Sequence, residues 1–159
     1  MRRKDREVTD PGQIRRILDA CKTCHLAMAD NGLPYVVPLS YAYTMEDGAI
    51  TLYFHSAKEG RKIGILRDNE AVCFEMCIEG EPVRPAGGPC DSGYYYSSVI
   101  GFGSAVFVDD IDEKRSALSM LMKHQENTDV GFTPAQAESV CVFKVVSADF
   151  AGKMKPRPS

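Results

Sequence analysis

The sequence predicts an α+β fold in which an antiparallel sheet curls into a closed or split barrel flanked by helices. Several runs rich in β-branched and aromatic residues follow one another with turn signals between them, which is typical of strands joined by hairpins. Three stretches with helical hydrophobic spacing interrupt these runs. The 159 residues are 44% hydrophobic, which is enough for one compact core. We therefore expect a single domain over residues 1–159.

The first helix is predicted to begin directly after Asp10. Asp10 is a favourable N-cap, Pro11 suits the first helical position, and Gln13 can reach back as in a capping box. The inward face is predicted to consist of Ile14, Ile17, Leu18 and Cys21.

The first strands follow this helix. Residues 23–29 alternate in polarity and end in the turn signal of residues 30–32. Residues 33–44 and 49–56 are β-rich and are joined by the hairpin signal MEDG. Pro38 removes a backbone donor, so its strand should lie at an edge of the sheet, or be bulged or broken between residues 37 and 39.

The second half of the chain alternates between helices and strands. We expect a helix over residues 58–69 with Ile63, Ile65 and Leu66 inward, and a strand over residues 71–80. The stretch 79–93 is rich in Pro and Gly and is predicted to be a long functional loop. A strand is expected over residues 94–110, where Gly101 and Gly103 indicate a bulge, a bend or a close backbone approach.

The last elements are an amphipathic helix and a strand. The helix is predicted over residues 111–127, with Asp112 as its cap and Leu118, Leu121 and Met122 inward. The strand is predicted over residues 139–155.

Charge and targeting signals exclude several classes of partner. The net charge of −3 argues against a general binder of nucleic acid or of anionic membranes. The N-terminus has no apolar run of signal-peptide length, and no segment approaches the roughly 20 apolar residues of a membrane helix. We therefore expect a cytoplasmic protein whose six irregularly spaced cysteines are free thiols.

The stretch CKTCH, residues 21–25, spells the attachment signature of a c-type haem. The two cysteines straddle a predicted junction between helix and strand, and covalent haem attachment is unexpected in the cytoplasm. His25 should also point to the opposite side of the strand from Cys24. We interpret the match as a coincidence. No second Cys or His pair stands at ligand spacing, so no metal site is predicted.

The stretch YFHSAKEGRKI, residues 53–63, is the best candidate for chemistry. A strand end delivers His55 and Ser56, and a helix carrying Arg61 and Lys62 begins a few residues later. Helix N-terminal amides, a hydroxyl and two cations together suit a phosphate. A solvated helix face with ordinary i,i+3 and i,i+4 ion pairs explains the same residue types equally well.

Five motifs, in this order and spacing, resemble the pyridoxamine-phosphate-oxidase-like split-barrel flavoproteins, and in particular their 5-nitroimidazole-resistance branch. They are MRRKDREVTD (1–10), PYVVPLSYAY (34–43), LYFHSAKEGRKI (52–63), YSSVIGFGSA (96–105) and DEKRSALSMLMKH (112–124). The resemblance implies an antiparallel split β-barrel (FMN-binding split barrel) with flanking helices. It also implies a homodimer that binds FMN in two equivalent clefts at the subunit interface.

The resemblance assigns residues to this FMN site. One strand would run beside the isoalloxazine ring, a second strand end would lie beside the ring and ribityl chain, a basic pair would hold the phosphate, and two residues would come from the other subunit. The strand beside the ring is Val37, Pro38, Leu39 and Ser40, and the second strand end is His55, Ser56 and Ala57. The basic pair at the phosphate is Arg61 and Lys62, and the two residues from the other subunit are Ser98 and Val99.

The activity implied by the resemblance is reduction of a nitro group on a small aromatic ring toward an amine. His55 is the side chain suited to proton delivery, with a merely hydrogen-bonding role as the alternative. A flavin- or haem-binding module without turnover remains a second hypothesis. We find no extra basic set for a second phosphate, so pyridoxamine phosphate is rejected as the substrate. Residues 81–91 are expected to govern substrate choice, and NAD(P)H could act as a diffusible reductant.

Overall fold

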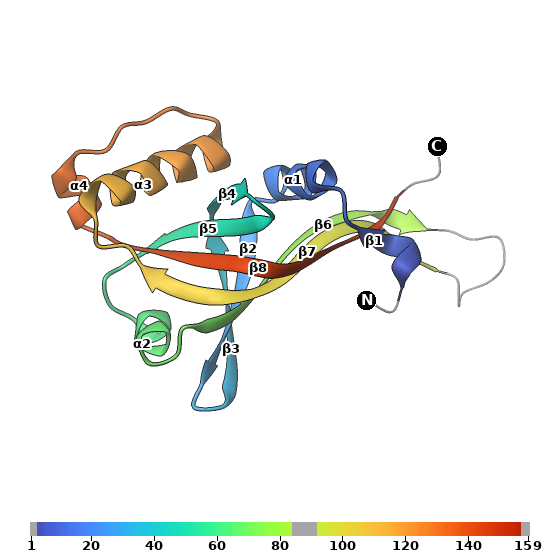
Figure 1. Ribbon diagram of the computed structural model, residues 1–159, viewed down its shortest axis with the longest axis horizontal. Helices are drawn as coiled ribbons and strands as arrows, with labels where there is room; N and C mark the ends of the chain where they lie inside the picture. Colours follow the sequence, from blue (N-terminus) through green and yellow to red (C-terminus); the bar gives the residue numbers. More distant parts are fainter. Residues whose placement is uncertain (1–2, 84–91, 157–159) are drawn as a thin grey trace.

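The computed structural model describes residues 3–83 and 92–156 and confirms the α+β class (Figure 1). An antiparallel sheet forms its centre, and helices flank this sheet. In chain order the elements are η1 (Lys4–Arg6, a 3-10 turn), β1 (Glu7–Val8), α1 (Pro11–Ala20), β2 (Thr23–Asp30), β3 (Leu33–Ser40), β4 (Ala42–Glu46), β5 (Ala49–Ser56), α2 (Arg61–Asp68), β6 (Ala71–Val83), β7 (Gly93–Phe107), α3 (Ile111–Glu126), α4 (Pro134–Glu138) and β8 (Cys141–Lys155).

The strand order makes the sheet a split barrel. Seven strands follow the order β3-β2-β6-β7-β8-β5-β4, and β1 pairs with β8. The two edge strands β3 and β4 are consecutive in the chain and are separated only by Tyr41. The sheet therefore curls so that its edges approach one another without pairing. Tyr41 is fully buried there, and its hydroxyl donates to the Leu18 carbonyl of α1 at 2.7 Å.

Two apolar clusters hold the fold together. The larger one fills the barrel, where the rings of Phe54 and Phe143 stack with their centroids 5.1 Å apart. The smaller one lies under α3 and α4 and includes Leu118, Leu121 and Val142. Strand residues alternate between these interiors and the outer face, as the side-chain period of a strand requires.

Several local predictions are confirmed. Asp10 caps α1, because its Oδ2 accepts a hydrogen bond from the Gln13 backbone N–H at 2.8 Å. Pro38 lies on the edge strand β3, which pairs only with β2 among the described strands. Both two-residue turns, at Asn31–Gly32 and at Asp47–Gly48, have positive φ at both positions.

The glycines of β7 mark close backbone approaches, as expected. A Cβ on Gly101 would lie 2.3 Å from Cζ of the buried Phe74 ring. A Cβ on Gly103 would lie 2.4 Å from the Val146 carbonyl oxygen, where the β7–β8 register shifts between Phe102 and Ser104. Only glycine fits these positions without displacing the neighbouring strands.

Other boundaries differ from the prediction. The run 33–44 is interrupted at Tyr41 rather than near Pro38, because the chain crosses there from one edge of the sheet to the other. α2 begins only at Arg61, since Gly60 has φ of 134° and ends the preceding turn. β6 continues through Val83 after a register shift between Glu79 and Pro82, so the predicted loop starts later. Most of the 81–91 segment lies outside the described residues.

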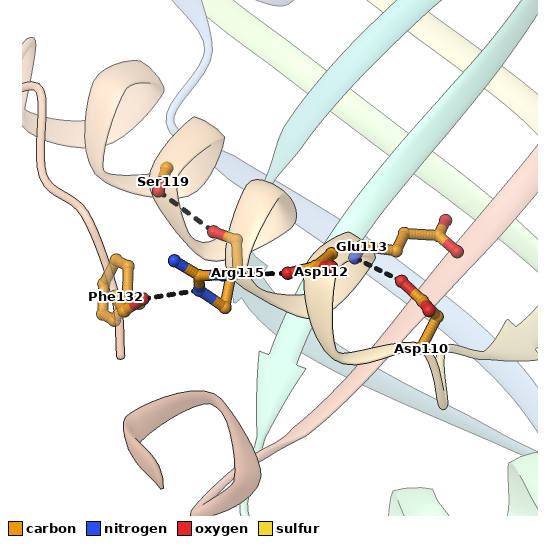
Figure 2. A network of polar contacts seen from close by, with 6 residues as sticks. All are labelled: Asp110, Asp112, Glu113, Arg115, Ser119 and Phe132. Atoms are coloured by element: carbon orange, nitrogen blue, oxygen red, sulfur yellow. Dashed lines mark hydrogen bonds and ion pairs between the residues drawn. The ribbon is translucent and has the colours of Figure 1, made fainter. Parts of the chain in front are cut away.

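The N-cap of α3 was predicted two residues too late. Asp110, not Asp112, is the N-cap, because its Oδ1 accepts from the Glu113 N–H at 2.8 Å (Figure 2). Asp112 instead accepts from Arg115, whose Nε donates to the Phe132 carbonyl at 2.7 Å (Figure 2). This bond ties α3 to the segment leading into α4.

The short elements β1 and α4 escaped the sequence prediction. β1 is only two residues long, and α4 spans five residues behind a Thr133 capping box. None of the helices in the described ranges is long and apolar enough to cross a membrane.

Candidate functional site

The turn from β5 into α2 brings together the strand end and the helix start that the sequence singled out. β5 ends at Ser56, and α2 begins at Arg61 without a side-chain cap on its first-turn amides. Gly60 occupies the position before α2 with φ of 134°, a conformation that favours glycine. The Ile63 N–H donates to the Gly60 carbonyl at 3.0 Å, so the first-turn groups left for an anion are the backbone N–H groups of Arg61 and Lys62.

His55 lies on the outer face of β5, next to this helix start. Its side chain is exposed, and its register partner on β8 is Val142. Partial burial against its surroundings lowers the pKa of His55 below the usual 6.5, and the positive charge of Lys62 lowers it further. The imidazole is therefore neutral at pH 7 and can accept a hydrogen bond or a proton.

Lys62 and Arg61 differ in what surrounds their charges. Lys62 is half-buried, and its ammonium group has no hydrogen-bond or ion-pair partner among residues 3–83 and 92–156. Arg61 is held by the β2–β3 hairpin: its Nε and Nη2 donate to Asp30 Oδ2 at 3.2 and 3.0 Å. Its guanidinium also lies 4.4 Å from the Tyr35 ring centroid. Lys62 is the uncompensated cation of the pair.

Ser56 and Ala57 occupy the strand end itself. Ser56 is buried, and its hydroxyl donates to the Ala57 carbonyl at 2.7 Å. Ala57 is exposed and leads into the turn toward α2. A ligand at this strand end would compete with the Ala57 carbonyl for the Ser56 hydroxyl.

The predicted residues of β3 lie on the open edge of the sheet. Val37 and Leu39 are half-buried and pack against the larger apolar cluster, whereas Pro38 and Ser40 are exposed. Because β3 pairs only with β2 among the described strands, its second edge is available to another molecule.

The remaining two predicted residues lie elsewhere on the sheet. Ser98 and Val99 belong to β7, where they pair with Cys77 and Met76 of β6. Both side chains are buried in the single chain: Ser98 is 9% exposed on the outer side of β7, and Val99 is fully buried on its inner side. One chain thus joins the residues of β5 and α2 at one site, whereas Ser98 and Val99 lie buried in β7, elsewhere in the sheet. Their approach to a cofactor from a second subunit stays a prediction.

The two cysteines of the CKTCH stretch belong to the core, whereas Lys22, Thr23 and His25 are exposed. Cys24 is fully buried and Cys21 is 4% exposed, so neither thiol can reach a porphyrin without unfolding the barrel. Burial raises the pKa of Cys21 to about 11, and it raises the pKa of Cys24 still further. His25 points outward, as expected, and its Nδ1 lies 2.9 Å from Glu75 Oε2.

Sequence reasoning missed the residues that surround the α2 helix in space. Asp30 and Tyr35 hold Arg61, yet they lie about thirty residues earlier in the chain. Lys58, Arg67 and Lys114 line a common cavity although they belong to a turn and two different helices. No sequence spacing connects these residues, because only the tertiary fold brings them together.

The electrostatics of His55 give a first testable prediction. The NMR titration of its ring protons should show a midpoint below 6.5, and Lys62→Ala should raise that midpoint because the neighbouring positive charge is gone. A histidine with a lowered pKa in the folded state stabilises the protein fully above 6.5, and this stability is lost as the pH falls toward the lowered value. An unchanged midpoint in Lys62→Ala would place the ammonium group away from His55.

Comparison with known proteins agrees with this geometry. The family model described as pyridoxamine 5'-phosphate oxidase matches residues 10–154. No curated protein sequence matches the chain. Among solved structures, a candidate 5-nitroimidazole antibiotic resistance protein from Bacteroides thetaiotaomicron is 30% identical, with a TM-score of 0.80 over 92% of this chain and 85% of that chain.

Two further structures extend the comparison. A FAD-binding protein from Mesorhizobium loti is 26% identical, with a TM-score of 0.68 over 95% of this chain and 98% of that chain. A flavocytochrome from Azotobacter vinelandii is 20% identical, with a TM-score of 0.80 over 99% of this chain and 73% of that chain, and shares the fold. The chain belongs to the pyridoxamine 5'-phosphate oxidase-like split-barrel family, in its 5-nitroimidazole-resistance branch.

Proposed function

We propose that this protein binds FMN and reduces the nitro group of nitroimidazoles or other small nitroaromatic acceptors. The observation that carries the proposal is the Lys62 ammonium, without a partner among the described residues, at the start of α2, a helix start without a side-chain cap that follows the end of β5 with His55. Family membership and the similarity to a candidate nitroimidazole resistance protein support it. A cytoplasmic location remains part of the proposal.

The residues of the site fit FMN in three respects. Lys62, the α2 amides and the remaining N–H groups of Arg61 would hold the phosphate. The open edge of β3 at residues 37–40 would lie along the ring, and Ser56 would serve the ribityl chain. The similarity to a FAD-binding protein supports a flavin more generally.

The chemistry requires a proton source that the chain supplies. Reduction of a nitro group to a nitroso group consumes two electrons, which the flavin supplies when bound, and two protons, and it releases water. His55 would take a proton from solvent and pass it to the acceptor from an imidazole nitrogen. Because the pKa of His55 is lowered, the rate of proton delivery should increase as the pH falls below 7.

The outer face of the sheet supports the proposed homodimer. Large apolar side chains on this face are strongly exposed, which is unusual for a monomer: Val36 (55%), Ile100 (46%), Phe102 (57%), Val106 (44%) and Val146 (44%). Ser98 lies on the same face of β7 as Ile100 and Phe102. A second subunit on this face would bring Ser98 toward the partner's cofactor.

A charge on this face should separate the subunits. Phe102→Asp is expected to convert a dimer into a folded monomer, because a carboxylate cannot be buried there without a partner. Light scattering coupled to gel filtration measures the mass, and circular dichroism verifies the fold. Lys4→Asp, a charge change on η1, is the control and should stay dimeric. A Phe102→Asp protein that stays dimeric would place the interface elsewhere.

Stopped-flow spectroscopy tests the proposed reaction. The FMN-loaded protein is reduced anaerobically and mixed with a nitroimidazole while the flavin absorbance is followed. We expect reoxidation that is saturable in nitroimidazole and slower in His55→Gln at unchanged flavin content. Reoxidation no faster than that of free reduced FMN would leave a flavin-binding module without nitroreductase turnover.

A further inference from the structure

A basic cavity lies beside α2, next to the end of β7 and the start of β8. It has a volume of about 370 Å³, which is within the range of small-molecule sites. Figure 1 shows α2 on one side of these strand ends and α3 with α4 on the other. The cavity is lined by Lys58, Arg67, Phe107, Val108, Asp109, Lys114, Val140, Cys141 and Val142.

The charges of this cavity favour an anion. Lys58, Arg67 and Lys114 contribute three positive charges, against the single carboxylate of Asp109. None of the three cations has an ion-pair or hydrogen-bond partner in the described part of the chain. Cations that converge on one cavity without partners raise the local concentration of anionic ligands.

The rest of the lining is apolar. Val108 and Val142 are buried, and their backbones are joined by a 3.0 Å hydrogen bond, which makes this wall rigid. The half-buried Phe107 ring lies 5.8 Å from the Arg67 guanidinium and offers a flat aromatic surface. The matching ligand therefore combines a phosphate with a flat, weakly polar group.

The cavity adjoins the flavin site proposed above. Lys58 lies in the turn between β5 and α2, and Cys141 is the register partner of Ser56. The charge of Lys62 acts on both His55 and the Cys141 thiol, so the start of α2 borders both sites.

We propose that this cavity binds the phosphate-bearing portion of a nucleotide, with the phosphates at Lys58, Arg67 and Lys114 and the base near Phe107. Two sources share this chemistry: the adenylate half of a dinucleotide flavin, and a nicotinamide dinucleotide reductant. That the bound nucleotide acts together with a flavin rests on the proposed function, whereas the binding of a nucleotide to this cavity does not.

Calorimetric titration with ADP tests the proposal on FMN-loaded protein. We expect saturable binding that Lys114→Gln and Lys58→Gln each weaken about 5-fold or more, since each removes one charge-assisted contact. Adenosine, which lacks the phosphates, should bind much more weakly. Lys123→Gln removes the same charge from the opposite end of α3 and should leave ADP affinity unchanged. No saturable ADP binding, or binding insensitive to Lys58→Gln and Lys114→Gln, overturns the proposal.

Two further measurements identify the source of the nucleotide. If the cavity holds the flavin's own adenylate, Lys114→Gln weakens FAD binding and leaves FMN binding unchanged. If it holds a reductant, Lys114→Gln raises the KM for NADH or NADPH and leaves both flavin affinities unchanged. Failure to bind FMN would refute the proposed function alone, because ADP can still be titrated into the flavin-free protein.

Discussion

Lys62→Ala should weaken FMN binding about 10- to 100-fold, the loss expected when one charge-assisted hydrogen bond to a phosphate is removed. Lys62 is half-buried at the start of α2, and no partner among the described residues neutralises its charge. The substitution should leave the barrel intact, since the ammonium group makes no contact that holds the fold. Quenching of flavin fluorescence, titrated into flavin-free protein, gives the two dissociation constants.

Riboflavin is the matched ligand for this test, because it carries the same ring without the phosphate. Its affinity should be the same for Lys62→Ala as for the unaltered protein. Arg61→Ala should weaken FMN binding less than Lys62→Ala, because Asp30 already compensates the Arg61 charge. Equal FMN affinity in Lys62→Ala, or an equal loss for riboflavin, would remove Lys62 from the phosphate site.

Local rules were sufficient for the elements whose ends are set by neighbouring residues. Asp10 with Pro11 predicted the start of α1, and the turn residues 31–32 and 47–48 predicted both hairpins. Pro38 predicted an edge, a bulge or a break, because its missing donor disrupts a central ladder, and the structure has Pro38 on the edge strand β3. These features depend on backbone chemistry within a few residues of the chain.

Elements that depend on distant contacts were not predictable in the same way. The break at Tyr41 follows from its burial against α1, and the continuation of β6 to Val83 follows from its pairing with β7. The choice between Asp110 and Asp112 as cap depended on where the backbone leaves its extended conformation, since both side chains suit the role.

In the candidate site, too, contacts between residues close in the chain were predictable, and contacts between distant residues were not. His55, Arg61 and Lys62 are within eight residues of one another, so one motif predicted their proximity. The contact between Arg61 and Asp30 joins α2 to the β2–β3 hairpin, and the basic cavity joins α2 to α3. Such contacts determine which cation is free for a ligand, and residue types alone do not reveal them.

Phe143→Ala should lower the free energy of unfolding by about 3–5 kcal/mol, the range for removing a large aromatic side chain from a packed core. Its ring is fully buried, stacks on Phe54 and lies 6.3 Å from the Phe107 centroid. A domain of this size is stable by about 5–15 kcal/mol, so the variant should unfold at a clearly lower urea concentration. Leu33→Ala, at a residue 61% exposed, should change stability by less than about 0.5 kcal/mol.

Phe143→Ala also tests whether this core contact supports the candidate site. Phe54 directly precedes His55 on β5, and Phe143 is its register partner on β8. Loss of the Phe143 ring leaves Phe54 without its stacking partner, so the end of β5 should become less ordered before the whole barrel unfolds. Hydrogen exchange should then be faster at the amides of residues 53–56 than in the unaltered protein. In α3, exchange should accelerate only as much as the loss of overall stability requires. Equal acceleration in both segments would show that the site is no more sensitive to this core contact than the rest of the fold.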